Sequence, residues 1–435
     1  MTEMLTRDAL LARYQKSGRP RADWLVGAEF ERHLLDPKGM PLPYSAPQGV
    51  RWMLEQLAQS HGSLEMEGDH PIALMREQAS VTLEPGGQFE LSGAPAKSLQ
   101  PIHDEARDFA AEVDALLGDN GIRQMAIGFT PFARITDIPW VPKGRYAVMK
   151  AHLARTGQLA HHMMKGTAAV QATYDYADEA DAARKVGLAT RLGPLTTAMF
   201  ANSPYAEGKA SGYMSFRGHI WTQTDPARTG LPDSVEPCSV ERWLDYLLDV
   251  PMMFIKDAAG NYLAANGMSF RHWMEGGMGV PPTSADWDLH LTSVFPEVRV
   301  KHTIEVRGAD CVPLPLAMSF VSLFKGLFYC DIALEAGNEL VSRFVQHGTK
   351  EARFAIACTD GLQGEIGGRK LVSWAEELVR MADEALERCA PEDRVWLKPL
   401  MRQIGLGESP ARTLLRKFGP EPSPDALLAS SHIVG

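Results

Sequence analysis

Acidic residues at alternate positions of an otherwise apolar strand constrain the fold of this chain more than any other feature. The segment Trp24–Leu35 reads as a β-strand whose alternation places Glu29 and Glu31 on one face and Phe30 on the other. Carboxylates side by side on one face repel each other unless that face is solvated or holds cations. We therefore expect a sheet with one apolar face and one face that forms a polar floor.

A second segment repeats the pattern as a predicted hairpin. Strands are expected over Ser80–Glu84 and Gln88–Ser92, joined by the turn Pro85-Gly86-Gly87. Glu84 and Glu90 would then lie at the mouth of this hairpin. The hairpin adds two acids to those of the first strand.

A third segment, Val298–Arg307, is predicted as one strand that gathers its charged residues, including Glu305 and Arg307, along one side. For an isolated pair of acids, a solvated strand face is the ordinary interpretation. Three acidic strands in one chain raise the alternative of a metal site, because clusters of oxygen ligands suit Mg²⁺, which often bridges to substrate phosphates. The residues alone leave both interpretations open.

Basic residues in Gly-rich or aromatic surroundings are the natural complement to these acids. They are Arg145, Arg217 and Arg307, whose planar guanidinium groups suit carboxylates and phosphates and keep their charge. A salt bridge to a nearby acid is the alternative for each. Gln171 and Thr173 share one face of a predicted strand and are candidates for neutral ligands, with a buried polar ladder as the alternative.

The remaining pattern mixes strands and helices without strict alternation, which favours an α+β fold with a largely antiparallel sheet. Further strands are expected within 72–92 and at Ile122–Phe129 and Ala168–Tyr174. Further helices are expected at Ser98–Leu117, Asp178–Leu192, Leu316–Leu334, Trp374–Leu386 and Val395–Ile404. No repeat or linker divides the 435 residues. We expect one catalytic domain, 1–435, with a sheet-borne site at about 24–310 and mainly helical support at about 311–435.

Composition excludes several classes of protein. The formal charge of −10 argues against nucleic acid or an anionic membrane as a partner. The five cysteines form no CxxC pair, as expected for a reduced protein, and the charged N-terminal residues leave no signal-peptide core. The two longest uncharged runs are shorter than a membrane span. We expect a cytoplasmic protein.

Several familiar catalytic devices are missing from the sequence, including the GxxxxGK[ST] phosphate loop, GxGxxG, GxSxG and HExxH. Two alternatives to a metal-dependent enzyme remain. One is a hydrolase that uses Glu84 and Glu90 as a carboxylate pair. The other is a non-catalytic sensor.

At the level of longer motifs, the chain resembles the plant and proteobacterial type of glutamate–cysteine ligase. The string EPGGQFELSGAP, within Val81–Pro95, is too long to match by chance. The other matching segments, in order along the chain, are Asp137–Pro139, Pro142–Tyr146, Leu195–Pro204, His219–Thr222, Phe295–Arg299 and Glu305–Asp310.

This resemblance implies a glutamine-synthetase-like fold, in which an antiparallel sheet forms a funnel that binds ATP, Mg²⁺ and glutamate. It implies that the γ-carboxylate of L-glutamate is phosphorylated by ATP and that the amine of L-cysteine then displaces phosphate. The product is γ-glutamylcysteine, made in the first step of glutathione biosynthesis. A sister ligase of the same fold that uses another amine is the alternative.

The resemblance also assigns roles to residues. It implies that two or more Mg²⁺ ions are held by Glu29, Glu31, Glu84, Glu90, Gln171 and Glu305. Arg217 and Arg307 would hold the carboxylate of glutamate or the transferring phosphoryl group, with Arg145 and Thr173 as further substrate contacts and with Glu305 and Arg307 facing the nucleotide.

Other properties follow less directly. The expected partners are L-glutamate, L-cysteine and ATP, and the expected assembly is a monomer or homodimer. No residue is identified as the general base. Where the plant enzymes carry regulatory cysteines, this chain has residues such as Asp104 and Ala265, so we expect the plant-type disulfide switch to be absent.

Overall fold

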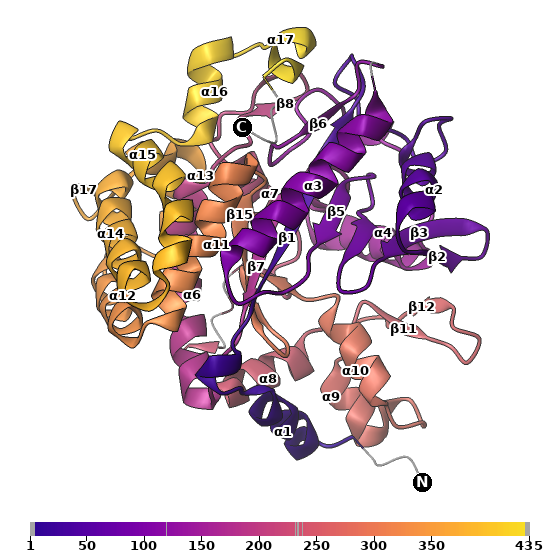
Figure 1. Ribbon diagram of the computed structural model, residues 1–435. Coiled ribbons are helices and arrows are strands. Elements are labelled where there is room, and N and C mark those ends of the chain that lie inside the picture. The colour runs from indigo at the N-terminus through magenta and orange to yellow at the C-terminus, as the bar shows by residue number, and fades with distance from the viewer. Residues whose placement is uncertain (1–4, 119, 231, 233–234, 237, 431–435) are drawn as a thin grey trace.

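A large antiparallel sheet lies at the centre of the computed structural model (Figure 1), which describes residues 5–118, 120–230, 232, 235–236 and 238–430. Within these residues the sheet has nine strands, in the order β14-β15-β7-β1-β5-β4-β3-β2, with β6 paired to β1. The strands are β1 Val26–Leu35, β2 Ser63–Glu67, β3 His70–Met75, β4 Ser80–Leu83, β5 Phe89–Ser92, β6 Arg123–Met125, β7 Ala169–Tyr174, β14 Val298–Val300 and β15 Ile304–Asp310. The predicted first strand and the predicted hairpin are confirmed.

The register of the sheet brings the polar residues of separate strands together. Glu31 on β1 lies opposite Glu90 on β5, and Glu29 lies opposite Gln171 on β7. Residues directly opposite on antiparallel strands place their side chains on the same face. The polar floor predicted from one strand therefore extends over several.

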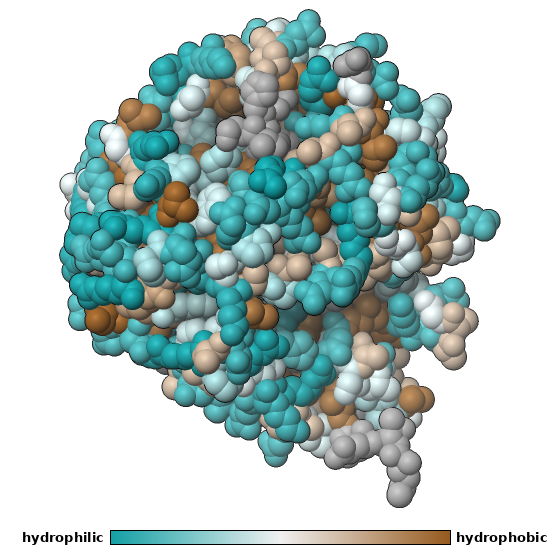
Figure 2. Space-filling model, in the orientation of Figure 1, coloured by the Kyte–Doolittle hydropathy of each residue, from teal (hydrophilic) through white to brown (hydrophobic). Residues whose placement is uncertain are grey.

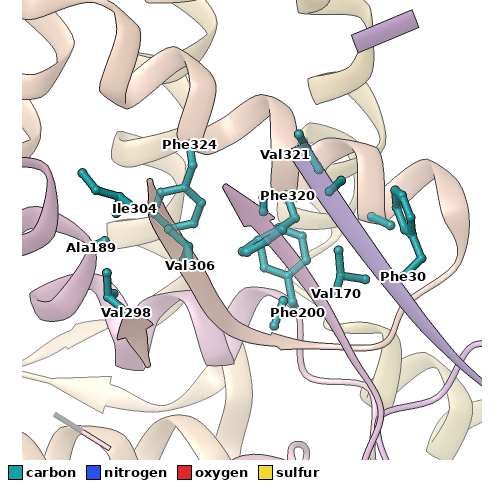
Figure 3. Close-up of a cluster of buried hydrophobic side chains, with 14 of the residues drawn as sticks. Phe30, Val170, Ala189, Phe200, Val298, Ile304, Val306, Phe320, Val321 and Phe324 are labelled. Carbon is teal, nitrogen blue, oxygen red and sulfur yellow. The ribbon is translucent and has the colours of Figure 1, made fainter. Parts of the chain in front are cut away.

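Helices cover the apolar face of the sheet. The principal ones are α3 Leu99–Leu117, α6 Glu179–Met199 and α11 Leu314–Tyr329, which contact β1, β15 and β7 respectively. Figure 3 shows Phe30 and Val170 of the sheet packed beside Phe320 and Val321 of α11. Burial of these large apolar side chains is the main stabilising term, at about 25 cal/mol per Å².

The other helices surround this core. They are α1 Arg7–Ser17, α2 Val50–Ser60, α4 Gly144–Thr156, α5 Ala160–Gly166, α7 Phe216–Thr222, α8 Val240–Asp249, α9 Phe270–His272, α10 Ser284–Leu291, α12 Asp331–Phe344, α13 Lys350–Asp360, α14 Leu371–Cys389, α15 Lys398–Leu406, α16 Pro410–Phe418 and α17 Pro424–Leu428. The other described strands form four small two-stranded sheets: β8 Tyr205–Ala206 with β9 Lys209–Ala210, β10 Thr229–Gly230 with β13 Phe295–Pro296, β11 Phe254–Lys256 with β12 Tyr262–Ala264, and β16 Glu365–Ile366 with β17 Arg369–Lys370.

Two hairpins project on the same side of the molecule. In Figure 1 the β2–β3 pair lies above the β11–β12 pair, and the space-filling view has a notch in its outline between them (Figure 2). The first turn of α4 lies against both hairpins, because Gly144 N donates to the Glu67 carboxylate at 2.5 Å and the Tyr262 ring lies close to Gly144. The rest of the face shown in Figure 2 is mostly hydrophilic.

Three expectations about secondary structure are wrong. Val298–Arg307 is not one strand but the hairpin β14–β15, closed by a bond from Lys301 N to Thr303 O at 3.0 Å. The polar alternation runs on through this turn, so periodicity does not reveal it. The predicted strand Ile122–Phe129 is confined to Arg123–Met125.

The third error concerns the helical run Leu316–Leu334, which is two helices. Cys330 has an extended backbone between α11 and α12, and the two axes differ by 101°. Apolar spacing continues across the break because both helices face the same core. In the described part of the chain no single helix is long and apolar enough to cross a membrane; the bent pair of α11 and α12 reaches that length and composition only together.

The turn between β4 and β5 depends on a close approach that only glycine allows. A Cβ on Gly86 would come within 2.2 Å of the Lys165 carbonyl oxygen, at the end of α5. We expect Gly86→Ala to lower the free energy of unfolding by about 1–3 kcal/mol, the usual cost of overpacking. Urea denaturation monitored by circular dichroism would measure this.

Gly405→Ala is the matched control for that substitution. Gly405 lies in α15, where an added Cβ would meet no neighbouring atom within 4 Å, and alanine favours the helix by up to about 1 kcal/mol. The control should be as stable as the wild type or more so. An unchanged urea midpoint for Gly86→Ala would contradict the close approach.

Candidate active site

A cavity of about 290 Å³ lies over the polar face of the sheet. Its floor comes from β1, β4, β5, β7, β14 and β15, and its opposite wall comes from α4, α5 and α7. Eight of the ten residues predicted from the sequence line it: Glu29, Glu31, Glu84, Glu90, Arg145, Gln171, Arg217 and Arg307. The structure therefore brings together most of the predicted site from well-separated parts of the chain.

Thr173 and Glu305 are the two predicted site residues that do not line the cavity. Thr173 is on the same sheet face, but its hydroxyl lies directly over Gly27, where a Cβ would come within 2.5 Å of it. The structure thus places Thr173 beside the site rather than in it. Glu305 is on the same sheet face as Gln171 but is buried, and two arginines that line the cavity bind it.

Three of the acids are only partly compensated by positive charge: arginines lower the pKa of Glu29 and Glu31, but burial and neighbouring carboxylates outweigh them. Burial and then the neighbouring Glu84 carboxylate raise the pKa of Glu31 to about 8. Burial and then Glu305 raise the pKa of Glu29, and burial and then Glu29 raise that of Glu90 well above its usual range. Neighbouring buried carboxylates repel each other unless protons or cations neutralise their charge.

Few protein groups satisfy the same acids. Glu31 accepts hydrogen bonds from Ala169 N at 2.8 Å and Gln171 Nε2 at 3.2 Å, and Glu90 accepts one from the Thr82 hydroxyl at 3.0 Å. Each carboxylate oxygen has two lone pairs, so these acids, which line the cavity, keep capacity to accept more. This is the donor set that a hard cation prefers.

Gln171 joins the acidic side of the floor to the basic side. Its Nε2 donates to Glu31 Oε1 at 3.2 Å, and its Oε1 accepts from Arg307 Nη1. An amide suits this position because it can donate and accept at once. In this orientation its oxygen faces a guanidinium group.

Glu305 is held by arginines on two sides. Arg299 Nε and Nη2 donate to its two oxygens at 2.8 and 2.9 Å, and Arg307 Nη1 donates to Oε1. Burial alone would raise the pKa of Glu305, but Arg299 and then Arg307 bring it well below its ordinary value. Glu305 is therefore an ionised anchor for these two arginines, unlike Glu29, Glu31 and Glu90.

Two other arginines, Arg145 and Arg217, line the cavity. Arg217 Nη2 donates to the Arg307 carbonyl at 3.0 Å. The Nε atoms of Arg217 and Arg145 are buried and have no hydrogen-bond partner among the described residues. A buried N–H without a partner costs about 1–3 kcal/mol, so neither guanidinium group is fully satisfied by the protein.

Sequence reasoning missed part of the lining. Lys143, Arg299 and Lys301 add positive charge; burial and then Arg145 lower the pKa of Lys143 to about 8, and its Nζ donates to the Leu83 carbonyl at 2.9 Å. Lys143 could have been found from its place beside Arg145 in one motif. The apolar wall, formed by Met149, Met163, Met164, Trp221 and Phe295, carried no such signal.

Two cysteines lie directly behind the site. The Cys311 thiol donates to the Glu31 carbonyl at 3.0 Å, and burial raises its pKa to about 12. Burial also raises the pKa of Cys358, which lies against Gly218 of α7. Both thiols are neutral near pH 7.

The donor set fits a hard cation such as Mg²⁺ in its chemistry. Within the described ranges, no three His, Cys, Asp or Glu side chains converge as a closed metal-binding group. The carboxylates instead surround an open cavity. Mg²⁺ is commonly held in this way, by one or two carboxylates with substrate phosphates completing its octahedron.

Comparisons with known proteins match almost the whole chain to glutamate–cysteine ligases. Residues 25–427 match the family model described as Glutamate-cysteine ligase family 2. The chain is 35% identical over 428 residues to the chloroplastic glutamate–cysteine ligase of Brassica juncea, covering 97% of this chain and 82% of that protein. It is 35% identical over 426 residues to glutamate–cysteine ligase B, chloroplastic, of Oryza sativa subsp. japonica, covering 96% and 85%.

Solved structures resemble the fold. A glutamate–cysteine ligase from Francisella tularensis in complex with AMP superposes with a TM-score of 0.59 at 12% identity, covering 94% of this chain and 87% of that one. A bifunctional glutathione synthetase from Pasteurella multocida gives 0.50 at 13% identity, covering 99% and 54%. The predicted α+β fold of glutamine-synthetase-like type is confirmed.

The raised pKa of Glu31 predicts how stability depends on pH without divalent cations. An unfolded Glu titrates near ~4.3, whereas folded Glu31 titrates at about 8. Its contribution to stability is therefore complete below about 4.3 and is lost as pH rises through about 8. Between pH 5 and pH 8, the free energy of unfolding of the wild type should fall by more than about 1 kcal/mol relative to that of Glu31→Gln.

Urea denaturation in a chelator at pH 5, 6, 7 and 8 would measure this difference. Glu241→Gln, at an exposed residue, is the control and should give a curve parallel to the wild type. Parallel curves for Glu31→Gln as well would show that Glu31 is not held in an environment that disfavours its charge.

Proposed function

This chain belongs to glutamate-cysteine ligase family 2, and from this premise we propose that its cavity joins the γ-carboxylate of L-glutamate to the amine of L-cysteine with the consumption of ATP. The ligation is the first step of glutathione biosynthesis. The observation that supports the proposal is the division of one cavity lining into acids whose pKa is raised and arginines. Such a lining suits a substrate set that contains both polyphosphate and carboxylate.

The chemistry requires activation of a poor acyl donor. A carboxylate resists attack because of its resonance and negative charge. Transfer of the γ-phosphoryl group of ATP to the glutamate γ-carboxylate removes both obstacles, and the cysteine amine then displaces phosphate from γ-glutamyl phosphate. The protein positions the reactants and stabilises the charge that develops, which is most of what phosphoryl transfer needs.

We propose that Glu29, Glu31, Glu84 and Glu90 hold two or more Mg²⁺ ions. When bound, Mg²⁺ would neutralise phosphate charge and polarise the transferring group. Cations would then compensate the buried negative charge that raises the pKa of Glu29, Glu31 and Glu90. Gln171 could join them only by turning its oxygen away from Arg307.

Glu305 has a different place in this proposal. The family resemblance implies a metal role for it, but both of its oxygens are bound by Arg299 and Arg307. We propose that Glu305 serves as the anchor of these two arginines. Their guanidinium groups stay charged at any pH at which the protein works.

The arginines would bind the anionic groups of the substrates. Arg217 and Arg307 are linked through the Arg307 carbonyl and are assigned to the glutamate carboxylate or the transferring phosphoryl group. Arg145 is assigned to a further anionic group of the substrates, because its Nε is buried without a partner in the described structure. No described residue stands out as the base that keeps the cysteine amine unprotonated.

A sister ligase that accepts another amine is the second candidate function, since the acids and arginines bind the donor and not the acceptor. The hydrolase alternative, which uses Glu84 and Glu90, is not supported by the family to which the chain belongs. The intact set of acids and arginines also argues against a degenerate sensor.

We further propose that the chain acts as one unit in the cytoplasm. The described core is continuous from Leu10 to Ile404. All five cysteines are free thiols, as expected in a reducing compartment. The plant relatives are named as chloroplastic.

Incubation with L-glutamate, L-cysteine, ATP and Mg²⁺ tests the activity. We expect ADP release and γ-glutamylcysteine detected by mass spectrometry, both dependent on every component. Replacing cysteine by other amines, at equal concentration, distinguishes the sister ligase. Faster ADP release with another amine would shift the assignment to that acceptor, and product formation without ATP would indicate a hydrolase-type enzyme run in reverse.

Glu84→Gln tests the cation proposal. Removing one negative charge from the four acids should raise the Mg²⁺ concentration needed for half-maximal rate and lower kcat by about 10²-fold, because the developing phosphoryl charge loses stabilisation. Steady-state kinetics over a Mg²⁺ series would show this, with direct Mg²⁺ binding by calorimetry as a second readout. Glu77→Gln, at an exposed residue before β4, is the control and should behave as the wild type. Equal Mg²⁺ requirements in all three proteins would refute the assignment.

A further inference from the structure

Asp310 is a buried carboxylate that the proposed chemistry leaves unused. It ends β15, is 1% exposed and does not line the cavity. Its oxygens accept three hydrogen bonds: Oδ1 from the Ser215 hydroxyl at 2.8 Å, and Oδ2 from the Ser203 hydroxyl at 2.6 Å and Asn202 N at 2.8 Å. Three hydrogen bonds to one carboxylate hold the Asp310 side chain in a single orientation.

The two serines that bind Asp310 also accept hydrogen bonds from the backbone of α7. Ser215 caps α7, accepting from Gly218 N at 2.9 Å, and Ser203 accepts from Arg217 N at 3.0 Å. A hydroxyl has one proton and two lone pairs. Because each proton is given to Asp310, the lone pairs of each hydroxyl are turned toward the first turn of α7, which carries Arg217.

A β-bulge puts Asp310 on the correct face for this role. Residues 307 and 310 are three apart and would point to opposite faces of a regular strand. The register of β15 shifts between Val306 and Ala309, so that Asp310 lies opposite Ala169. Ala169 lines the cavity, and Asp310 and Arg307 therefore share the cavity face.

The guanidinium group of Arg217 is held by the same strand. Its Nη2 donates to the Arg307 carbonyl at 3.0 Å, and its Nη1 is 3.9 Å from Asp310 Oδ1. The longer distance is an ionic contact and not a hydrogen bond. Asp310 thus acts on the Arg217 guanidinium group through its charge, without a direct hydrogen bond to it.

We propose that Asp310 is a positioning residue for the ligation: through Ser203 and Ser215 it fixes the backbone of Arg217, and through its charge it fixes the guanidinium group, in the orientation that binds the anionic group of glutamate. This inference rests on the proposed function. Asp310 itself touches no substrate.

A double-mutant cycle tests the inference. Asp310→Asn, which offers an N–H₂ where a hydroxyl or backbone donor already points, should raise the KM for glutamate about 10-fold or more with the KM for ATP changed less than about 2-fold. In an Arg217→Lys background, the same change should raise the KM for glutamate by less than about 2-fold. Equal effects in both backgrounds, or equal effects on both substrates, would overturn the positioning role.

Asp393→Asn is the matched control, since Asp393 is also a 1%-exposed carboxylate and it accepts from Leu99 N and Lys325 away from the cavity. It should lower the melting temperature and leave the KM for glutamate unchanged. If Asp310→Asn does not fold, Ser203→Ala and Ser215→Ala take its place in the cycle, with the same outcomes. If the wild type has no ligase activity, the proposed function is rejected. If the wild type is active but the effects of the Asp310 and Arg217 substitutions on the KM for glutamate multiply independently, only the role of Asp310 is rejected.

Discussion

Repulsion among carboxylates buried on one sheet face governs the structure around the cavity. Taking each ion out of water costs several kcal/mol, so each needs a compensating charge. The protein supplies that charge to Glu305 through direct bonds from Arg299 and Arg307, whereas burial and neighbouring carboxylates outweigh the nearby arginines and raise the pKa of Glu29, Glu31 and Glu90. One side of the cavity is therefore rich in carboxylates with raised pKa, and the other side is rich in arginine.

The apolar face of the sheet makes this arrangement possible. Helices α3, α6 and α11 bury that face in a continuous core, so the strands keep their register although their polar face is electrostatically unfavourable. Register matters because a slip of one residue would exchange the two faces. Phe30 and Val170, paired across β1 and β7, hold the positions of Glu29, Glu31 and Gln171 on the opposite side.

Strand alternation predicted the acidic face correctly because it is a local property of the chain. Glu29 and Glu31 follow from spacing alone, and the hairpin that carries Glu84 and Glu90 follows from its glycine turn. The turn at Lys301–Thr303 was missed because charged residues alternate through it, and with it the pairing of Arg299 and Glu305. Thr173 was included because it shares a strand face with Gln171, but only the close approach of Gly27 shows that its hydroxyl lies outside the cavity.

Other parts of the site depend on contacts that no local pattern encodes. Asp310 reaches the cavity face through a bulge, and bulges leave no periodic signal. Met149, Met163 and Trp221 have the spacing of ordinary core residues, and only tertiary packing turns them toward a cavity. The family motifs supplied the roles of residues, whereas the three-dimensional structure supplied which of them are paired.

The buried thiols behind the floor have a consequence for an enzyme whose substrate and product both carry a free thiol. Cys311 and Cys358 lie within a few residues of the cavity wall, yet burial keeps each in its neutral form. Thiol–disulfide exchange proceeds through a thiolate, and neither side chain is open to solvent. Cystine, the disulfide of the substrate, therefore cannot readily exchange with Cys311 or Cys358, because exchange would need a protein thiolate to attack its S–S bond and release cysteine thiolate. This chemical self-protection follows from packing alone.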